Sequence, residues 1–208
     1  MRRALCFGDS NTYGCGPTPA LGYRVVLQRG ARWGDVLSAG LGDGWEVVVE
    51  GLPGRTTVFD DPVEGEYRNG LRSMRAILES HQPIDVLIIC LGTNDMKLRM
   101  GLGPQDIALG VQRLVDEASS LGIIEKILVV CPPLVKERGD LAEMFKGAEE
   151  RFVGTAAQME RFTREIGADF MDAGALIAVD EIDGVHWNAE SHAILGRAVA
   201  DKVRAMIS

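Results

Sequence analysis

The chain has 208 residues, a usual length for one domain, and we expect a single domain over residues 1–208. Its formal net charge of −8 argues against binding to nucleic acid or to an anionic membrane surface, because both need a basic face. No apolar run approaches the roughly 18–20 residues of a membrane span. The apolar stretch after the two N-terminal arginines covers only residues 4–7, shorter than the roughly 7–15 residues of a signal-peptide core, so we expect a cytoplasmic protein.

Short apolar runs bounded by turn residues alternate with segments of helical periodicity along the chain. In chain order we predict a strand at 4–7, a helix at 32–41, a strand at 46–50, a helix at 71–78, a strand at 86–91, a helix at 107–121, a strand at 127–130, a mostly helical stretch at 141–165, a strand at 169–171 and a helix at 194–207. This alternation predicts a parallel sheet covered by helices on both faces. Ligands of such sheets bind beyond the carboxyl ends of the strands.

Two irregular segments interrupt this pattern, at residues 14–30 and 132–139. The first follows the turn after the first predicted strand, and the second directly follows the fourth. Because binding residues are often carried on such connecting segments, we expect both to border a ligand site.

The four cysteines, Cys6, Cys15, Cys90 and Cys131, are widely spaced and include no CxxC pair. This spacing is not typical of a metal site, and in a cytoplasmic protein it favours reduced core cysteines. Cys15 follows Ser10 by five residues, so its thiol could lie near a site built on that serine. We predict no metal and no cofactor.

Four polar segments lie where this architecture places a site. Ser10, Gly54 and Asn94 follow the first three predicted strands, and Asp183 and His186 precede the last helix. Each alone has an ordinary structural interpretation: a helix cap, a turn, a loop hydrogen bond or a buried histidine. Together they supply a nucleophile, a base with its carboxylate, and N–H donors for an oxyanion. The set predicts nucleophilic catalysis by Ser10.

The same segments resemble the four sequence blocks of the SGNH hydrolases, also called GDSL esterases. The matching residues are Ser10 in Gly-Asp-Ser, Gly54 in Gly-Arg-Thr, Asn94 in Gly-Thr-Asn-Asp, and Asp183 with His186 in Asp-Gly-Val-His. The resemblance implies an α/β fold, a three-layer flavodoxin-like sandwich with a five-stranded parallel sheet. It also implies metal-free hydrolysis of ester or thioester bonds by Ser10, His186 and Asp183. The oxyanion hole would then comprise the backbone N–H groups of Ser10 and Gly54 and the side chain of Asn94.

Two residues depart from the usual blocks. Asn11 follows the nucleophile, where leucine is common, and Arg55 stands where many members carry an acid. The first block is similar to that of a branch of small bacterial aryl and acetyl esterases. We assign Asn11, Arg55 and Trp187 as candidate substrate-binding residues. Two alternatives stay open: Arg55 points into solvent, and Trp187 packs beneath the base.

Four further polar residues are assigned structural roles. Asp9 and Asp95 are expected to brace the loops of the site rather than react. His192, within the last helix, is expected to be structural, and His81, beside a proline turn, to lie on the surface.

The function that this sequence favours is hydrolysis of short-acyl esters, such as acetyl esters of sugars or small aryl esters. One alternative is a thioesterase or lysophospholipase, which would need an apolar groove near residues 132–139. An acyltransferase with the same triad and a non-enzymatic binding domain are others. The motifs Gly-x-Ser-x-Gly, Gly-x-Gly-x-x-Gly, His-Glu-x-x-His and the Walker loop are absent from the sequence. Residues 14–30 are long enough to reach a second copy, so a homo-oligomer is a further possibility.

Overall fold

The computed structural model describes residues 1–207. Its helices and strands are β1 Arg2–Gly8, α1 Ser10–Tyr13, α2 Trp33–Leu41, β2 Trp45–Gly51, α3 Gly70–Ser80, β3 Ile84–Cys90, α4 Pro104–Ser120, β4 Ile124–Cys131, α5 Ala148–Arg151, α6 Thr155–Glu165, β5 Asp169–Asp172 and α7 Ala189–Ile207. Short 3₁₀ turns lie at Glu66–Arg68, Asn94–Met96, Leu98–Met100, Gly139–Leu141 and Ala173–Ala175.

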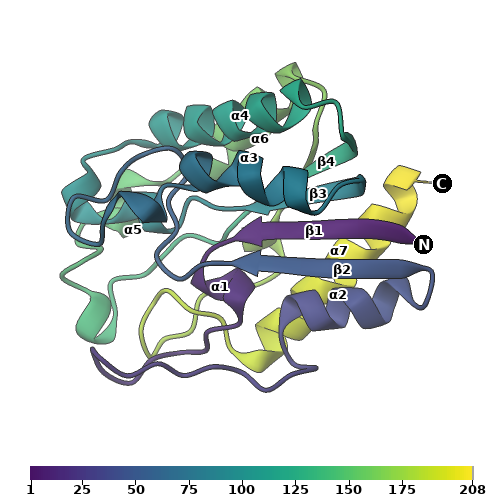
Figure 1. Cartoon of the computed structure of the whole chain (residues 1–208). Coiled ribbons are helices and arrows are strands. Elements are labelled where there is room, and N and C mark those ends of the chain that lie inside the picture. Colours follow the sequence, from purple (N-terminus) through teal and green to yellow (C-terminus); the bar gives the residue numbers. More distant parts are fainter. Residues whose placement is uncertain (208) are drawn as a thin grey trace.

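The five strands form one sheet in the order β2-β1-β3-β4-β5, and every neighbouring pair is parallel. Helices α2 and α7 cover one face, and α3, α4 and α6 cover the other (Figure 1). The predicted three-layer α/β sandwich is therefore confirmed. The strand order reverses direction between β1 and β3, and the crevice at such a switch point is where sheets of this kind bind ligands.

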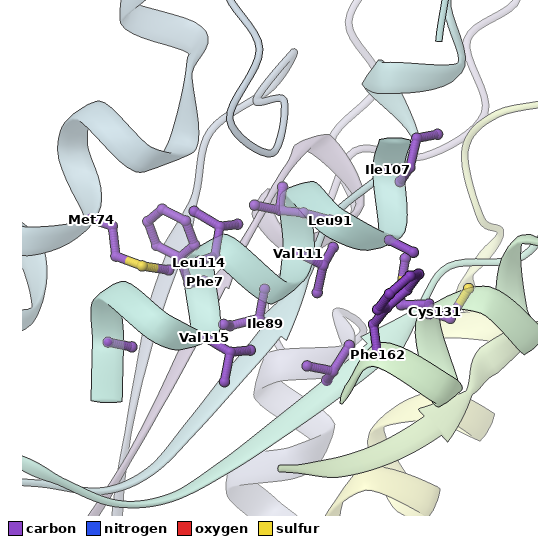
Figure 2. Close-up of a cluster of buried hydrophobic side chains, with 14 of the residues drawn as sticks. Phe7, Met74, Ile89, Leu91, Ile107, Val111, Leu114, Val115, Cys131 and Phe162 are labelled. Carbon is purple, nitrogen blue, oxygen red and sulfur yellow. The ribbon is translucent and has the colours of Figure 1, made fainter. Parts of the chain in front are cut away.

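Alternate residues of the central strands enter opposite layers of the core. In β1, Leu5 and Phe7 pack toward α3 and α4, whereas Ala4 and Cys6 pack toward α2 and α7, and none of the four is exposed. Figure 2 shows Phe7 beside Met74 of α3. Burial of each large apolar side chain contributes about 1.5–3 kcal/mol. Since both faces of these strands are apolar, polar residues appear only where the strands end.

The stretch at 141–165 is less helical than the sequence predicted. It holds the short helix α5 and the longer α6, separated by turns at which Gly147 and Gly154 adopt φ values of 77° and 88°. Glycine in this left-handed region is typical of helix ends. The apolar spacing runs on through Gly154, so periodicity alone could not locate the break.

All four cysteines are buried and unpaired. Within residues 1–207, no helix is long and apolar enough to cross a membrane. The same part of the chain holds no group of three or more histidine, cysteine or acidic side chains placed to bind a metal ion.

Candidate active site

The polar segments singled out in the sequence meet at the carboxyl ends of the strands. Ser10 follows β1 as the first residue of α1, and Asn94 opens the turn after β3. Gly54 lies in the turn after β2. These three residues and His186 line one cavity of about 190 Å³. The structure thus places the predicted nucleophile, oxyanion donors and base around a common space.

A tight turn from strand to helix presents Ser10. The carboxylate of Asp9 caps α1 by accepting a hydrogen bond from the N–H of Asn11 at 3.0 Å. A Cβ at Gly8 would lie 2.0 Å from Oγ1 of Thr12, so only glycine fits at the end of β1. Gly14 ends the helix after one turn with φ 96°. The serine is 7% exposed and borders the cavity.

His186 connects Ser10 to a buried carboxylate. Its Nε2 lies 3.1 Å from Oγ of Ser10, and its Nδ1 lies 2.7 Å from Oδ2 of Asp183. Oδ1 of Asp183 accepts the backbone N–H groups of Val185 and His186 at 2.9 Å each. Burial by itself raises the pKa of Asp183, but the hydrogen bond and positive charge of His186 bring it below its ordinary value. The carboxylate is therefore ionised at neutral pH and can fix the imidazole tautomer.

The residues predicted to supply the oxyanion donors line the same cavity. Gly54 has φ 82°, and a Cβ there would lie 2.4 Å from Oε2 of Glu64, so the position requires glycine. Nδ2 of Asn94 donates to the carbonyl of Arg55 at 3.1 Å and lies 3.4 Å from Oδ2 of Asp9. These contacts tie the loop after β3 to those after β1 and β2, and so orient the amide next to Ser10.

Asn11 does not line the cavity, contrary to its assignment as a substrate-binding residue. It is 1% exposed, and its side chain bridges to the loop that carries the base. Its Nδ2 donates to the carbonyl of Val185 at 3.3 Å, and its Oδ1 accepts the N–H of Trp187 at 3.2 Å. This bridge holds the base loop against α1 and sets the separation of His186 from Ser10.

The assignment of Trp187 to substrate binding is likewise contradicted. Its side chain is 1% exposed and packs beneath the base loop against His192, with 5.4 Å between the ring centroids. His192 is fully buried and its Nδ1 accepts the N–H of Trp33 at 3.1 Å, as expected of a structural histidine. Burial lowers the pKa of His192 to about 4, so it stays neutral.

Arg55 neither points into solvent nor reaches the cavity, so both interpretations of this residue are wrong. It is 3% exposed, and its guanidinium lies 4.1 Å from the ring centroid of Phe7. It donates to the carbonyls of Gly8, at 2.8 Å, and Glu50. Burial lowers its pKa to about 10, which leaves it charged at neutral pH. Arg55 thus joins the ends of β1 and β2 beneath the site.

The two neighbouring aspartates brace the loops, as expected. Asp95 is fully buried and accepts the N–H and hydroxyl of Thr57, the latter at 2.6 Å. Burial raises the pKa of Asp95 to about 7, against the effect of these hydrogen bonds. Burial likewise raises the pKa of Asp9 to about 6, although the N–H of Asn11 and the charge of His186 oppose the shift.

Only one of the two irregular segments borders the cavity. From residues 14–30, the side chains of Cys15, Thr18, Tyr23 and Arg24 line it. Residues 132–139 do not, and the opposite wall comes from a segment just after them, at 141–145. The 132–139 segment instead supports the base loop, since the N–H of Lys136 donates to the carbonyl of Gly184 at 2.7 Å.

Cys15 lies at the cavity, and His81 lies away from it. The thiol of Cys15 does lie at the cavity, but burial raises its pKa to about 11, so it is a poor nucleophile at neutral pH. His81 is half-buried rather than fully at the surface, with Nε2 3.0 Å from Oε1 of Glu50.

Sequence reasoning missed two charged residues at the cavity, Glu64 and Lys97. Both lie in irregular segments, where no periodicity indicates which way a side chain points. Lys97 is 2% exposed although it is a lysine, and this burial is visible only in the folded chain.

Known proteins resemble this chain both in sequence and in fold. The model of the GDSL-like lipase/acylhydrolase family matches residues 6–194. The inhibitor-bound aryl esterase of M. smegmatis is 36% identical with a TM-score of 0.92, and the match covers 99% of each chain. Est24, a carbohydrate acetylesterase from Sinorhizobium meliloti, is 36% identical with a TM-score of 0.93, over 99% of this chain and 100% of that one.

A putative arylesterase from Agrobacterium tumefaciens str. C58 is also 36% identical, with a TM-score of 0.85 and 99% of each chain covered. A search of curated proteins found no match. The chain belongs to the GDSL-like lipase/acylhydrolase family. It is a carboxylic ester hydrolase of the SGNH type.

Proposed function

We propose that this enzyme hydrolyses acetyl and other short-acyl esters through an acyl-enzyme on Ser10. The observation that carries the proposal is the hydrogen-bonded series Ser10–His186–Asp183, with distances of 3.1 and 2.7 Å, at a cavity of about 190 Å³. Pockets for drug-sized ligands usually measure about 300–1,000 Å³. A cavity below that range favours a small acyl group, as does the likeness to an aryl esterase and a carbohydrate acetylesterase.

In the first half of the reaction, Nε2 of His186 takes the proton of Ser10 as Oγ attacks the ester carbonyl. Asp183 stabilises the imidazolium that forms. The negative carbonyl oxygen is held by the backbone N–H groups of Ser10 and Gly54 and by Nδ2 of Asn94. Collapse of the tetrahedral intermediate breaks the bond to the alcohol, which leaves with the proton from His186.

In the second half, a water molecule attacks the acyl-enzyme. His186 takes one proton from this water, and the same donors stabilise the second tetrahedral intermediate. The acid then leaves, and Oγ of Ser10 recovers its proton from His186. An alcohol could replace water in this step, so acyl transfer stays a prediction beside hydrolysis.

Replacement of Asn94 by alanine should lower kcat by about 10²–10³-fold, because one oxyanion donor is lost. KM should change little if the amide acts mainly on the transition state. Steady-state kinetics with p-nitrophenyl acetate measure both constants. Asn94→Asp serves as a matched variant that keeps the size but replaces the donor with an acceptor, and it should be at least as slow. Full activity in Asn94→Ala would remove this residue from the oxyanion hole.

The acyl-length preference is tested with p-nitrophenyl esters from acetate to palmitate. We expect kcat/KM to be highest for acetate and to fall as the chain exceeds the cavity. Spontaneous hydrolysis of each ester is subtracted. A maximum at palmitate would favour the lysophospholipase alternative and contradict the short-acyl proposal.

A second cavity is relevant to the lysophospholipase alternative. It measures about 390 Å³ and is lined by residues 132–134 and 152–156, near the place where a long acyl chain would need a groove. Ser10, Asn94 and His186 do not line it. The geometry therefore does not support hydrolysis of long-chain acyl esters. The positions proposed for catalysis are all occupied by competent residues, which argues against a non-enzymatic binding domain.

Three sequence-based expectations stay predictions. These are a cytoplasmic location, the absence of nucleic-acid and membrane partners, and self-association. Leu21 and Tyr23, at 60% and 70% exposed, give residues 14–30 an apolar surface that would suit contact with a second copy.

A further inference from the structure

Glu64 lines the catalytic cavity, and one of its two carboxylate oxygens accepts no hydrogen bond from residues 1–207. Glu64 lies between β2 and α3 and lines the cavity beside Gly54, with its side chain 28% exposed. Its Oε2 is the atom nearest to where a Cβ of Gly54 would be, at 2.4 Å. Within residues 1–207, Oε2 accepts no hydrogen bond, and its ion pair with Nε of Arg68 is long, at 3.9 Å.

The other oxygen of Glu64 is fully engaged. Oε1 accepts hydrogen bonds from Nζ of Lys97 at 2.5 Å and from Nη2 of Arg99 at 2.6 Å. Two charge-assisted hydrogen bonds fix the carboxylate in one orientation. Oε2 is therefore held toward the cavity, and it can accept a hydrogen bond from a bound molecule without reorganisation of the side chain.

A buried ionic cluster supports this arrangement. Asp61 has no exposed side-chain area, and it pairs with Lys97 at 3.1 Å and with Arg99 at 2.7 Å. Its Oδ1 also accepts the N–H groups of Val63 and Glu64, at 2.9 and 3.1 Å, and so fixes the turn that carries Glu64.

The two negative and two positive side chains of this cluster have no net charge, and this affects the nearby oxyanion hole. An isolated carboxylate beside Gly54 would repel the negative oxygen of the tetrahedral intermediate. Lys97 and Arg99 offset the charges of Asp61 and Glu64. The cavity thus gains a strong acceptor without a net negative charge that would oppose catalysis.

We infer that Oε2 of Glu64 accepts a hydrogen bond from a hydroxyl on the alcohol half of the ester, and so selects polyol or sugar acetates over esters of simple alcohols. The inference rests on the proposed short-acyl function, because an acetyl group has no hydroxyl and the donor must then belong to the alcohol. Gly54 and Pro53, which also line the cavity, have no side-chain acceptor. Glu64 is accordingly a specificity-determining residue.

The test compares two acetates that differ in hydroxyl groups, glycerol 1-monoacetate and propyl acetate. The measured quantity is the ratio of their kcat/KM values in wild type, Glu64→Gln and Glu64→Ala. A hydrogen bond to a charged group discriminates by about tenfold or more. We expect wild type to favour the monoacetate, Glu64→Ala to lower the ratio about tenfold, and Glu64→Gln, which keeps an acceptor oxygen, to fall between them.

Glu66→Gln is the matched control, since Glu66 lies two residues away, is 71% exposed and pairs with Arg72 outside the cavity. Its ratio should equal that of wild type.

General disruption by Glu64→Ala would slow both acetates equally, and an unchanged ratio in this variant contradicts the inference while the proposed function stands. A parallel pair, methyl glycolate and methyl acetate, places the hydroxyl on the acyl half. If the Glu64 variants alter only that ratio, the inference is also overturned. Failure of wild type to cleave any of the four esters would instead reject the proposed function together with the inference.

Discussion

Replacement of Ser10 by alanine is expected to lower kcat for p-nitrophenyl acetate by on the order of 10⁶-fold. The variant keeps the oxyanion donors and the base but lacks the oxygen that forms the acyl-enzyme. Direct attack by water at the same cavity leaves only a small residual rate. The measurement is steady-state hydrolysis, with thermal unfolding to show that the fold is unchanged.

Ser119→Ala provides the matched control, because this serine is exposed near the end of α4 and takes no part in the site. It should retain the wild-type rate. A Ser10→Ala variant that keeps more than about one per cent of the activity would show that another residue or a water molecule acts as nucleophile.

The second large effect is expected for Asp183→Asn, with a loss in kcat of about 10⁴-fold. The amide is nearly the same size, but it has no charge to stabilise the imidazolium, and its NH₂ group favours the wrong tautomer of His186. The loss should be smaller than that of Ser10→Ala, because the nucleophile and the oxyanion donors remain. The measurement is kcat for p-nitrophenyl acetate.

Asp180→Asn tests the same change of charge in the same loop. The carboxylate of Asp180 accepts the N–H of Ile182 and the side chain of Asn188. Asp180 meets His186 through its backbone, whose N–H donates to the carbonyl of His186 at 2.9 Å, and this bond is kept in Asp180→Asn. We expect near-normal turnover from this control. A loss below about tenfold in Asp183→Asn, with an unchanged melting temperature, would mean that Asp183 only shapes the loop.

The sequence predicted the layers and the positions of the reacting groups because both follow from local signals. Apolar runs such as the one at 86–91 indicate strands buried on both faces, and polar residues can follow only where such strands end. Ser10 and Asn94 therefore lie at the same edge of the sheet. Sheet order and the separation of Ser10 from His186 depend on contacts between distant segments, which local patterns do not contain.

The errors concern side chains whose direction is set by tertiary packing. Arg55 follows an oxyanion donor in the chain, but its guanidinium turns toward Phe7 of β1. Asn11 follows the nucleophile, yet its amide bonds to Val185, 174 residues away. In both cases adjacency in sequence suggested a substrate contact, whereas the free energy gained by satisfying a buried polar group decided the orientation.

Glu64 shows the opposite error, because it lines the cavity but was not predicted as a site residue. No motif includes it, and its segment has no regular secondary structure between β2 and the turn at Glu66–Arg68. Its position beside Gly54 depends on the buried Lys97, which lies 33 residues from Glu64 and 36 residues from its other partner, the buried Asp61. Such an ionic cluster cannot be read from composition, because most lysines and glutamates lie at the surface.

The central claim is that Ser10 is the nucleophile, and covalent labelling tests it most directly. The enzyme is treated with diethyl p-nitrophenyl phosphate, which transfers its phosphoryl group to an activated serine, and the product is analysed by intact and peptide mass spectrometry. We predict a single adduct on Ser10 in wild type, none in Ser10→Ala and much slower labelling in His186→Ala. An adduct on another residue, or one that persists in Ser10→Ala, would contradict the account.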